Sequence, residues 1–236
     1  MDPVSQDTIN SLDGISLFSS LTKAEKDELA RQCRFKRYAV GEHIIDGQSE
    51  SKDIFFVVSG TVRVVNYSLS GREVALDDIG AGNYFGELAA LDGGPRSAFV
   101  VAQGGDAVAA AMSPEVFQRL ISTKPLVGTE IMRRLARMVR QANDRIMDLS
   151  VLGANNRVHA ELLRQAWAFT KDGKTASIKP IPVHSDIASR VSTTRETVAR
   201  VLNELAREGL VERQKDALLI RDMAKLAVMV EDVRGS

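Results

Sequence analysis

The spacing of apolar positions divides the chain into a strand-rich stretch and a helical stretch. Across residues 38–111, short apolar runs alternate with glycines and polar turns, and turns are expected at Ser59-Gly60 and Ser70-Gly71. The expected strands are residues 54–58, 61–65, 73–76, 99–102 and 107–110. Many short strands with closely spaced turn signals are typical of a β-sandwich or jelly roll. The chain is therefore expected to be α+β, with an N-terminal β jelly roll.

The period becomes helical after this region. Ser113 is a suitable N-cap, Pro114 stands in the first turn, and a long helix is expected from residues 127–130 to about residue 151. Apolar positions recur along it at steps of about three and four, the spacing of a coiled-coil seam. The seam positions are Ile131, Leu135, Met138, Ala142, Leu149 and Leu152, with an imperfection where Arg145 takes the inward position beside Ile146. A homodimer would cover this stripe most simply, and packing on the chain's own barrel is the alternative.

Gly153 interrupts the helical pattern and marks a hinge. The glycine ends the long helix, and Asn155 is expected to cap the next one. This break predicts three parts: a jelly-roll domain at residues 1–126, a dimerisation helix at 127–152 and a further domain at 153–236. Trp167 and Phe169 belong to the helix after the break and are expected in the core.

The third part contains two short helical patterns joined by a tight turn. Residues 184–191 and 195–207 flank Ser192-Thr193-Thr194, which is the arrangement of a helix-turn-helix. A hairpin of residues 209–213 and 218–221 follows as a wing. Many such turns have glycine where Ser192 stands, and the left-handed conformation costs a serine about 1–2 kcal/mol. The third part is therefore expected to be a winged helix-turn-helix.

The start of the second helix in this motif carries side chains suited to DNA. The first residues of a recognition helix reach base edges, where arginine bonds guanine and glutamate accepts from cytosine. Hydroxyl groups in the turn can bond phosphate. The residues expected to contact DNA are Thr193, Thr194, Arg195, Glu196 and Arg200. The alternative is ordinary surface charge on a helix.

A segment inside the strand-rich region suits a phosphorylated ligand. In residues 84–98, glycines allow a close backbone approach, and Arg96 offers a fixed cationic fork for phosphate. Glu87 would repel a phosphate, so it is expected to accept a hydrogen bond from a sugar hydroxyl. The segment predicts a pocket for a ligand with one phosphate and a ribose, and a turn with a surface arginine is the alternative.

Composition narrows the possible functions. The 236 residues carry a formal net charge of zero, so DNA contact must come from a local patch. Cys33 is the single cysteine, so neither an internal disulfide nor a cysteine-ligated iron–sulfur cluster is expected, and a reducing cytoplasm fits. We recognise no secretion signal, membrane span, metal-ligand cluster or nucleophile–base arrangement, and expect a protein that is not an enzyme, has no resident metal and does not enter a membrane.

Two segments resemble a known family. Gly86-Glu87-Leu88-Ala89 followed by Pro95-Arg96-Ser97-Ala98 closely resembles the phosphate-binding cassette of cyclic-nucleotide-binding domains. The run from Thr194 to Arg200 is very similar to the recognition segment of the bacterial superfamily of cyclic-AMP receptor proteins and fumarate–nitrate regulators. The resemblance implies a cytoplasmic, homodimeric transcription regulator. It would bind cyclic AMP in each jelly roll, read a palindromic TGTGA-like site on double-stranded DNA and contact RNA polymerase.

The same resemblance implies roles for single residues. Arg96 and Ser97 would hold the cyclic phosphate, Glu87 would hold the ribose 2′-hydroxyl, and Gly86 would supply a backbone contact. Leu88 belongs to the same binding segment. On the long helix, Asn143 would face the adenine, although Ala142 replaces the hydroxyl residue that is common beside it. The alternative for Asn143 is a polar residue that sets the register of a coiled coil.

The nature of the signal has alternatives within the same fold. Cyclic GMP is the first alternative, because Ser97 could also bond a guanine. A different small ligand is the second. A haem is not expected, because His43, His159 and His184 are scattered along the chain and their surroundings do not suggest an axial ligand.

Overall fold

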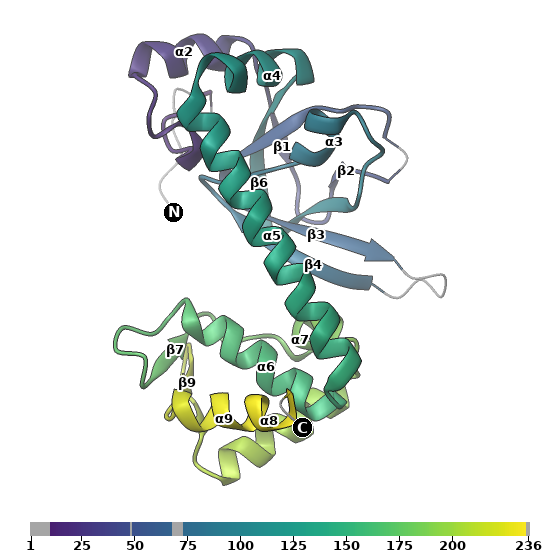
Figure 1. Ribbon diagram of the computed structural model, residues 1–236, viewed down its shortest axis with the longest axis vertical. Coiled ribbons are helices and arrows are strands. Elements are labelled where there is room, and N and C mark those ends of the chain that lie inside the picture. The colour runs from purple at the N-terminus through teal and green to yellow at the C-terminus, as the bar shows by residue number, and fades with distance from the viewer. Residues whose placement is uncertain (1–9, 48, 68–72, 235–236) are drawn as a thin grey trace. The chain divides into compact units, whose positions relative to one another are not determined.

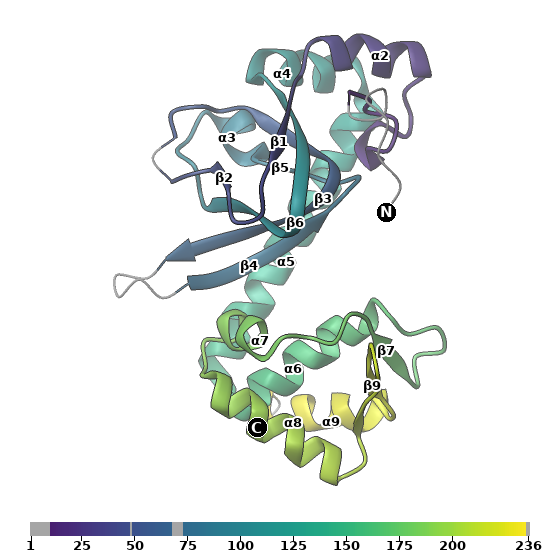
Figure 2. The same cartoon turned by 180° about the vertical axis from the view of Figure 1, so that it is seen from behind.

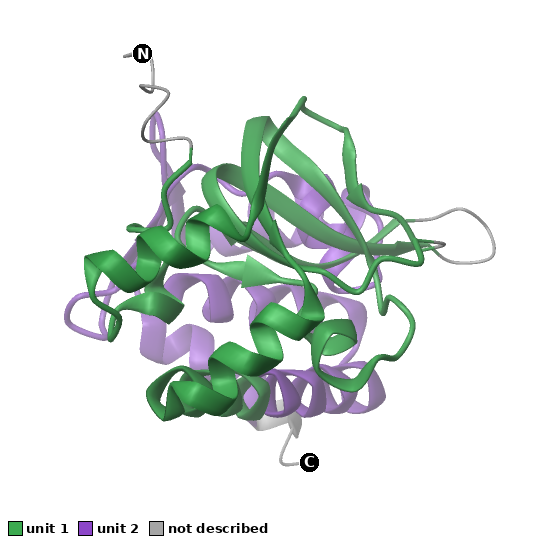
Figure 3. Ribbon diagram, turned by 90° about the horizontal axis from the view of Figure 1, so that it is seen from above, with its two compact units in different colours: residues 1–137 green, residues 138–236 purple. Residues whose placement is uncertain are grey.

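The computed structural model describes residues 10–47, 49–67 and 73–234. The chain divides into two compact units, Met1–Arg137 and Met138–Ser236, which Figure 3 shows in different colours. The long helix α5 (Pro125–Val151) runs from the first unit into the second. The three parts expected from the sequence place their boundaries elsewhere, at either end of this helix.

The first unit is an antiparallel jelly roll with helices at one end (Figure 1). Its elements before α5 are η1 (Ser16–Phe18), α2 (Lys23–Arg31), β1 (Arg34–Tyr38), β2 (His43–Ile45), β3 (Ile54–Tyr67), β4 (Glu73–Gly80), β5 (Tyr84–Phe85), α3 (Glu87–Asp92), β6 (Phe99–Met112) and α4 (Pro114–Thr123). The main sheet has the order β1-β6-β3-β4, with β2 paired to β6 and β5 paired to β3. The short helix α3 interrupts the strands, as the sequence predicted.

Two strands are longer than the sequence predicted. Ser59-Gly60 is not a turn, because β3 continues through it with register shifts against β6 on both sides of Ser59. Gly60 has φ 80°, and a Cβ there would lie 2.5 Å from the Asp106 carbonyl oxygen. The glycine therefore forms a bulge that lets two long strands bend around the barrel. The runs 99–102 and 107–110 likewise belong to the single strand β6. The turn expected at Ser70-Gly71 lies outside the described residues.

The helices at the end of the jelly roll begin at side-chain caps. Thr22 and Glu25 form the reciprocal capping box of α2, and the Ser113 hydroxyl accepts from the main-chain N–H of Val116 at the start of α4. Helices α2 and α4 lie together in both views (Figure 1, Figure 2), joined by an ion pair between Glu25 and Lys124. Their apolar faces close one end of the barrel around Phe18, Phe56 and Phe117, which are fully buried.

The exposed stripe of α5 differs from the expected seam. Ile131 is buried in the core of the first unit, and Leu152 packs with Ala160 and Val230 in the second. Met132, Val139 and Ile146 recur every seven residues and are 64%, 60% and 60% exposed. Exposed Ala142 and Leu149 continue this stripe, and half-buried Leu135, which also packs against the core of the first unit, completes it. The exposed seam is therefore Met132, Leu135, Val139, Ala142, Ile146 and Leu149, with Leu135 as its half-buried member. Its steps of three and four are regular, and Arg145 does not interrupt it.

The second unit is a winged helix-turn-helix. Its elements after α5 are α6 (Ala154–Trp167), β7 (Ala176–Ile178), α7 (His184–Arg190), α8 (Arg195–Arg207), β8 (Val211–Arg213), β9 (Leu218–Ile220) and α9 (Met223–Arg234). The strands pair antiparallel in the order β7-β9-β8. Helix α6 packs on α8 and α9, and the shared core contains Leu162, Ile187, Leu205 and Ile220. The architecture confirms the α+β fold expected from the sequence.

Two expectations for α6 are wrong. Trp167 and Phe169 are 58% and 42% exposed, because the buried face of α6 ends at Ala166 and the next residue points about 100° away from it. Gly153, rather than Asn155, occupies the N-cap position of α6. The Asn155 side chain instead accepts a hydrogen bond from Arg200 of α8.

Candidate functional site

Arg96 is a buried cation without a carboxylate partner among the described residues. It is 9% exposed, and its two terminal nitrogens donate to main-chain carbonyls, Nη2 to Asp53 at 2.9 Å and Nη1 to Gly86 at 3.3 Å. Its Nε is buried and unbonded. The carboxylate of Asp53 is bonded to Arg34 at 2.5 Å instead. Burial lowers the pKa of Arg96, with partial compensation from Asp53. A bound anion would supply the missing counter-charge.

Gly86 allows Arg96 to approach the backbone. It caps α3 with φ 79°, and a Cβ at this position would lie 2.9 Å from Arg96 Nη1 and 3.0 Å from the Asp53 carbonyl oxygen. A side chain here would therefore strain the backbone and displace the guanidinium. The glycine serves the arginine of the site as well as any ligand.

Glu87 is a buried carboxylate that faces the long helix. It is 4% exposed, and burial raises its pKa, with partial compensation by its own main-chain N–H and by Arg134. Arg134 of α5 brings its Nε to 3.9 Å from Glu87 Oε1, and its Nη2 donates to the Tyr84 carbonyl at 3.0 Å. Its guanidinium also lies over the Tyr84 ring, 4.5 Å from the centroid. The site thus includes a side chain from α5.

Arg134 is a site residue that the sequence pattern does not single out. The residue lies in the basic run Arg133-Arg134, and Arg133 is exposed and paired with Glu130 of the same helix. The pattern alone cannot tell which of two adjacent arginines faces the barrel. The 3.6-residue period, with Ile131 buried three positions earlier, is the one signal that favours Arg134.

The other expected ligand residues lie in more open places. Ser97 is exposed, and its carbonyl accepts from Asn66 at 3.1 Å. Leu88 is an exposed apolar side chain in the first turn of α3. Asn143 is exposed on α5, nine residues after Arg134, which is about 13 Å farther along the helix axis. The structure brings Gly86, Glu87 and Arg96 together, and the contact of Asn143 with a base stays a prediction.

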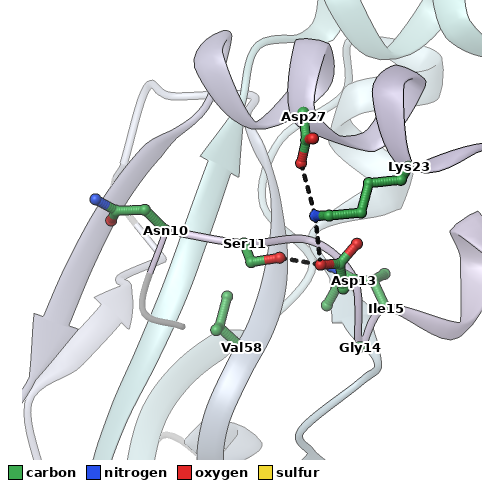
Figure 4. A pocket seen from close by; sticks show the side chains of 8 residues that line it. All are labelled: Asn10, Ser11, Asp13, Gly14, Ile15, Lys23, Asp27 and Val58. Carbon is green, nitrogen blue, oxygen red and sulfur yellow. Dashed lines mark hydrogen bonds and ion pairs between the residues drawn. The ribbon is translucent and has the colours of Figure 1, made fainter. Parts of the chain in front are cut away.

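A different hollow of the first unit has its charges already paired (Figure 4). Its lining residues are Asn10, Ser11, Asp13, Gly14, Ile15, Lys23, Asp27 and Val58. Lys23 Nζ lies 2.9 Å from Asp13 and 3.1 Å from Asp27, and the bond from Lys23 lowers the pKa of Asp13. Because these exposed charges neutralise one another, this hollow is a weaker anion site than the one at Arg96.

The recognition helix begins as the sequence predicted. Thr194 is the N-cap of α8, and its hydroxyl accepts from the main-chain N–H of Thr197 at 3.2 Å. Ser192 has φ 52°, so the serine does adopt the left-handed turn in place of glycine. The main-chain N–H of Thr193 donates to Ala188 at 3.0 Å and closes the turn. The first helix of the motif therefore holds the start of α8.

The side chains expected to read DNA are all on or beside the start of α8. Arg195 and Glu196 are exposed in its first turn. The main-chain N–H of Glu196 and then the Thr194 hydroxyl lower the pKa of Glu196, which is therefore an ionised acceptor near neutral pH. Arg200 donates to Asn155 at 2.9 Å and to Glu204 at 3.3 Å, so this expected DNA contact has partners within the protein.

A basic cluster extends this face beyond the predicted residues. Burial lowers the pKa of His184, at the start of α7, and nearby Arg195 and Arg213 lower it further. Arg213 is exposed at the end of strand β8 of the wing. His184 and Arg213 were not among the residues expected at DNA, because only the fold brings the start of α7, the start of α8 and the wing together.

In the part of the chain that the structure describes, no group of three or more His, Cys, Asp and Glu side chains could hold a metal ion. None of the helices in residues 10–47, 49–67 and 73–234 combines the length and apolar character needed to cross a bilayer.

The jelly roll contains a buried arginine without a bonded counter-charge, and the recognition helix of the winged helix-turn-helix begins with an exposed arginine. Together these features define the class of ligand-responsive DNA-binding regulators. Comparison with known proteins agrees with this class. Residues 35–124 match the model of the cyclic nucleotide-binding domain, and residues 156–229 match that of the Crp-like helix-turn-helix domain.

Individual relatives cover most of the chain. The cyclic AMP receptor protein of Thermus thermophilus is 34% identical over 90% of this chain and 95% of its own length. The CRP-like cAMP-activated global transcriptional regulator of Mycobacterium tuberculosis is 30% identical over 78% of this chain and 83% of its own. The structure of a CooA mutant from Carboxydothermus hydrogenoformans shares the fold, with a TM-score of 0.75, 24% identity and coverage of 85% and 88% of the two chains.

The chain belongs to the superfamily of cyclic-AMP receptor proteins and fumarate–nitrate regulators. It is a DNA-binding transcription regulator with a cyclic-nucleotide-binding domain and a helix-turn-helix. The family resemblance seen in the sequence is confirmed.

Proposed function

We propose that this chain is a cyclic-AMP-responsive homodimer that reads a palindromic TGTGA-like site on double-stranded DNA. The proposed ligand is supported chiefly by the surroundings of Arg96, which is 9% exposed and bonded only to carbonyls among the described residues. A cyclic phosphate has the charge and the acceptor oxygens that this guanidinium lacks. Glu87, which follows Gly86 in the chain and is buried, accepts the ribose 2′-hydroxyl.

The same proposal assigns the remaining ligand contacts. Ser97 and the main chain at Gly86 and Leu88 hold the phosphate side of the ligand, and Asn143 faces the base. Arg134 joins this set, because it lies against both Glu87 and Tyr84. The nucleotide then binds to groups on α3 and α5 at once, so its binding energy can bias the position of α5.

Dimerisation follows from the exposed seam of α5. Met132, Val139 and Ile146 repeat every seven residues on one face of a 27-residue helix. A second copy of the same helix buries this stripe in a two-fold interface, since each seam is complementary to itself. Two recognition helices then meet half-sites about one helical turn of DNA apart, which matches a palindrome.

The proposed protein acts in the cytoplasm as a sensor and not as an enzyme. Its relatives include proteins named as transcriptional regulators. In this proposal Arg96 bonds the cyclic phosphate and Glu87 accepts from the ribose, so both side chains hold the ligand instead of cleaving it. A regulator of this kind would also contact RNA polymerase.

The test is DNA-binding anisotropy of the full chain on a palindromic TGTGA-type duplex. It compares no ligand, cyclic AMP and cyclic GMP at one salt concentration, because affinity for DNA depends on salt. Tighter binding with cyclic AMP alone supports the proposal. Tighter binding with cyclic GMP alone replaces the ligand and keeps the mechanism. DNA affinity that neither nucleotide changes contradicts the proposed signal. Consumption of cyclic AMP, detected by chromatography, would contradict the sensor role.

A further inference from the structure

Arg157 of α6 joins three main-chain carbonyls from two separate segments. Its Nη1 donates to Leu152 at 2.9 Å, its Nε to Val191 at 2.8 Å and its Nη2 to Ser192 at 3.2 Å. Leu152 is the residue after the last turn of α5, and Val191 and Ser192 form the turn between α7 and α8. One guanidinium therefore connects the end of the long helix to the turn of the DNA-reading motif, within the second unit.

A positive charge at the position of Arg157 is electrostatically unfavourable unless these hydrogen bonds compensate for it. It lies in the first turns of α6, where the helix dipole repels a cation. The carbonyl of Leu152 lies at the negative end of the α5 dipole, and the two turn carbonyls add further partial negative charge. The side chain is half-buried, so these bonds are partly shielded from water. The arrangement stabilises the arginine only when all three carbonyls are in place.

The turn that Arg157 holds is strained. Ser192 has φ 52°, a left-handed conformation that favours glycine. Such a conformation in another residue persists where its surroundings determine it more strongly than its own preference does. The bonds from Arg157 to Val191 and Ser192 and the closing bond from Thr193 to Ala188 are those surroundings.

We propose that Arg157 is a positioning residue for DNA reading. By fixing the Val191–Ser192 turn against the end of α5, it sets the direction in which α8 presents Arg195 and Glu196 to base edges. The inference rests on DNA binding by α8, and it does not depend on which ligand the jelly roll takes. Arginine is required at this position because a lysine ammonium cannot direct three donors at carbonyls in one plane.

The experiment measures the affinity of the full chain for two duplexes. One is a site that the wild-type protein itself selects from a randomised pool, and the other is a shuffled sequence of the same length. The variants are Arg157→Lys, Ser192→Gly and the double variant, with Arg140→Lys on the exposed face of α5 as the control. Thermal unfolding monitors the fold of each.

We expect Arg157→Lys to weaken binding to the selected site by roughly tenfold and binding to shuffled DNA by less than about twofold, because phosphate contacts from other residues remain. Ser192→Gly relieves the strained turn, so it should restore most of the lost affinity in the Arg157→Lys background while changing the wild type little. Arg140→Lys should match the wild type on both duplexes.

Three results would overturn the proposal. The first is equal weakening on both duplexes, which would make Arg157 a general charge contact. The second is a loss of affinity in proportion to the loss of thermal stability. The third is a Ser192→Gly change that restores no affinity in the Arg157→Lys background. Either of these would make the role of Arg157 merely structural. A wild-type protein that ignores cyclic AMP contradicts the proposed ligand but leaves this comparison intact, because all variants are measured under the same ligand condition.

Discussion

Arg134 brings its Nε to 3.9 Å from the buried carboxylate of Glu87, across the space between α5 and α3. This contact connects the phosphate-binding segment of the jelly roll to the helix that carries the exposed seam. The distance is longer than a hydrogen bond, and the Nε of Arg134 is buried without a hydrogen-bond partner. A ligand hydroxyl between or beside the two groups would satisfy both, so the pair is open to reorganisation on binding.

Glu87→Gln is expected to weaken cyclic AMP binding and to stabilise the ligand-free protein at neutral pH. Burial raises the pKa of Glu87 above its ordinary value of 4.5, so the folded protein keeps this proton to a higher pH than the unfolded chain does. Its contribution to stability is therefore greatest below pH 4.5 and is lost as the pH rises through the folded pKa. Glutamine removes that loss, and it also removes the charged acceptor for a ribose hydroxyl.

Thermal unfolding at about pH 4 and about pH 7, together with calorimetric titration of the nucleotide, checks both effects of Glu87→Gln. Glu115→Gln is the matched control with the opposite sign. The Ser113 side chain and the main chain lower the pKa of Glu115, so its carboxylate stabilises the fold above pH 4.5. A Glu87→Gln protein that is less stable at neutral pH would contradict the burial of an ionised Glu87.

Arg96→Lys is expected to lower cyclic AMP affinity strongly while the jelly roll stays folded. The loss of one charge-assisted hydrogen bond corresponds to about 1.5–3 kcal/mol, or roughly 10–150-fold in the dissociation constant. Lysine keeps the charge but cannot reach the Gly86 and Asp53 carbonyls and a phosphate together. Arg34→Lys is the control, because Arg34 bonds the side chain of the same Asp53 from an exposed position. Wild-type nucleotide affinity in Arg96→Lys would exclude this arginine from the pocket.

Val139→Glu is expected to convert the proposed dimer into a monomer. Val139 lies at the centre of the exposed seam, and two-fold symmetry would place two carboxylates against each other in an apolar interface. Sedimentation velocity measures the change, with Arg140→Glu as a control that alters charge on a neighbouring face. If Met138→Glu dissociated the dimer and Val139→Glu did not, the seam would follow the register inferred from the sequence instead.

Arg195→Ala is expected to cost about 1–3 kcal/mol at one base position of the half-site and little at the others. The side chain is exposed in the first turn of α8, where recognition helices meet base edges. A panel of single-base substitutions in the selected site, measured by anisotropy, locates that position. Arg207→Ala in the last turn of α8 is the control. Uniform weakening on every sequence would assign Arg195 to the phosphate backbone.

Local signals in the sequence predicted much of the fold and part of the site. The Ser113 cap and the turn at Ser192 depend on neighbours within a few residues, and each was found where expected. The phosphate-binding segment was also recognisable, because its glycines, Glu87 and Arg96 lie close together in the chain.

The features that the sequence analysis missed depend on contacts between distant segments. Ile131 and Met132 are both apolar, and only the jelly-roll core decides that Ile131 is buried and Met132 is exposed. Arg134 faces Glu87 and Tyr84 for the same reason. The Ser59-Gly60 turn was wrong because a glycine in a strand and a glycine in a turn share the same local signal, and pairing with β6 selects the bulge.

DNA affinity is expected to rise as the pH falls through the range around the ordinary histidine pKa of 6.5, and His184 is the group responsible. Burial, Arg195 and Arg213 lower the pKa of His184 in the free protein. DNA phosphates near the two arginines would neutralise their repulsion of the His184 cation, so the pKa of His184 rises on binding and the complex takes up a proton.

The effect of His184 on folding has the opposite sign: a lowered histidine pKa stabilises the fold above pH 6.5, and this contribution is lost as the pH falls. Anisotropy titrations and thermal unfolding between about pH 8 and about pH 6 therefore separate the effect on DNA binding from the effect on folding. As the pH falls, DNA affinity should increase while thermal stability decreases. His184→Gln should flatten the affinity profile, and His43→Gln in the jelly roll should leave it unchanged. A wild-type profile that is flat, or one that His184→Gln does not alter, would show that His184 lies outside the DNA interface.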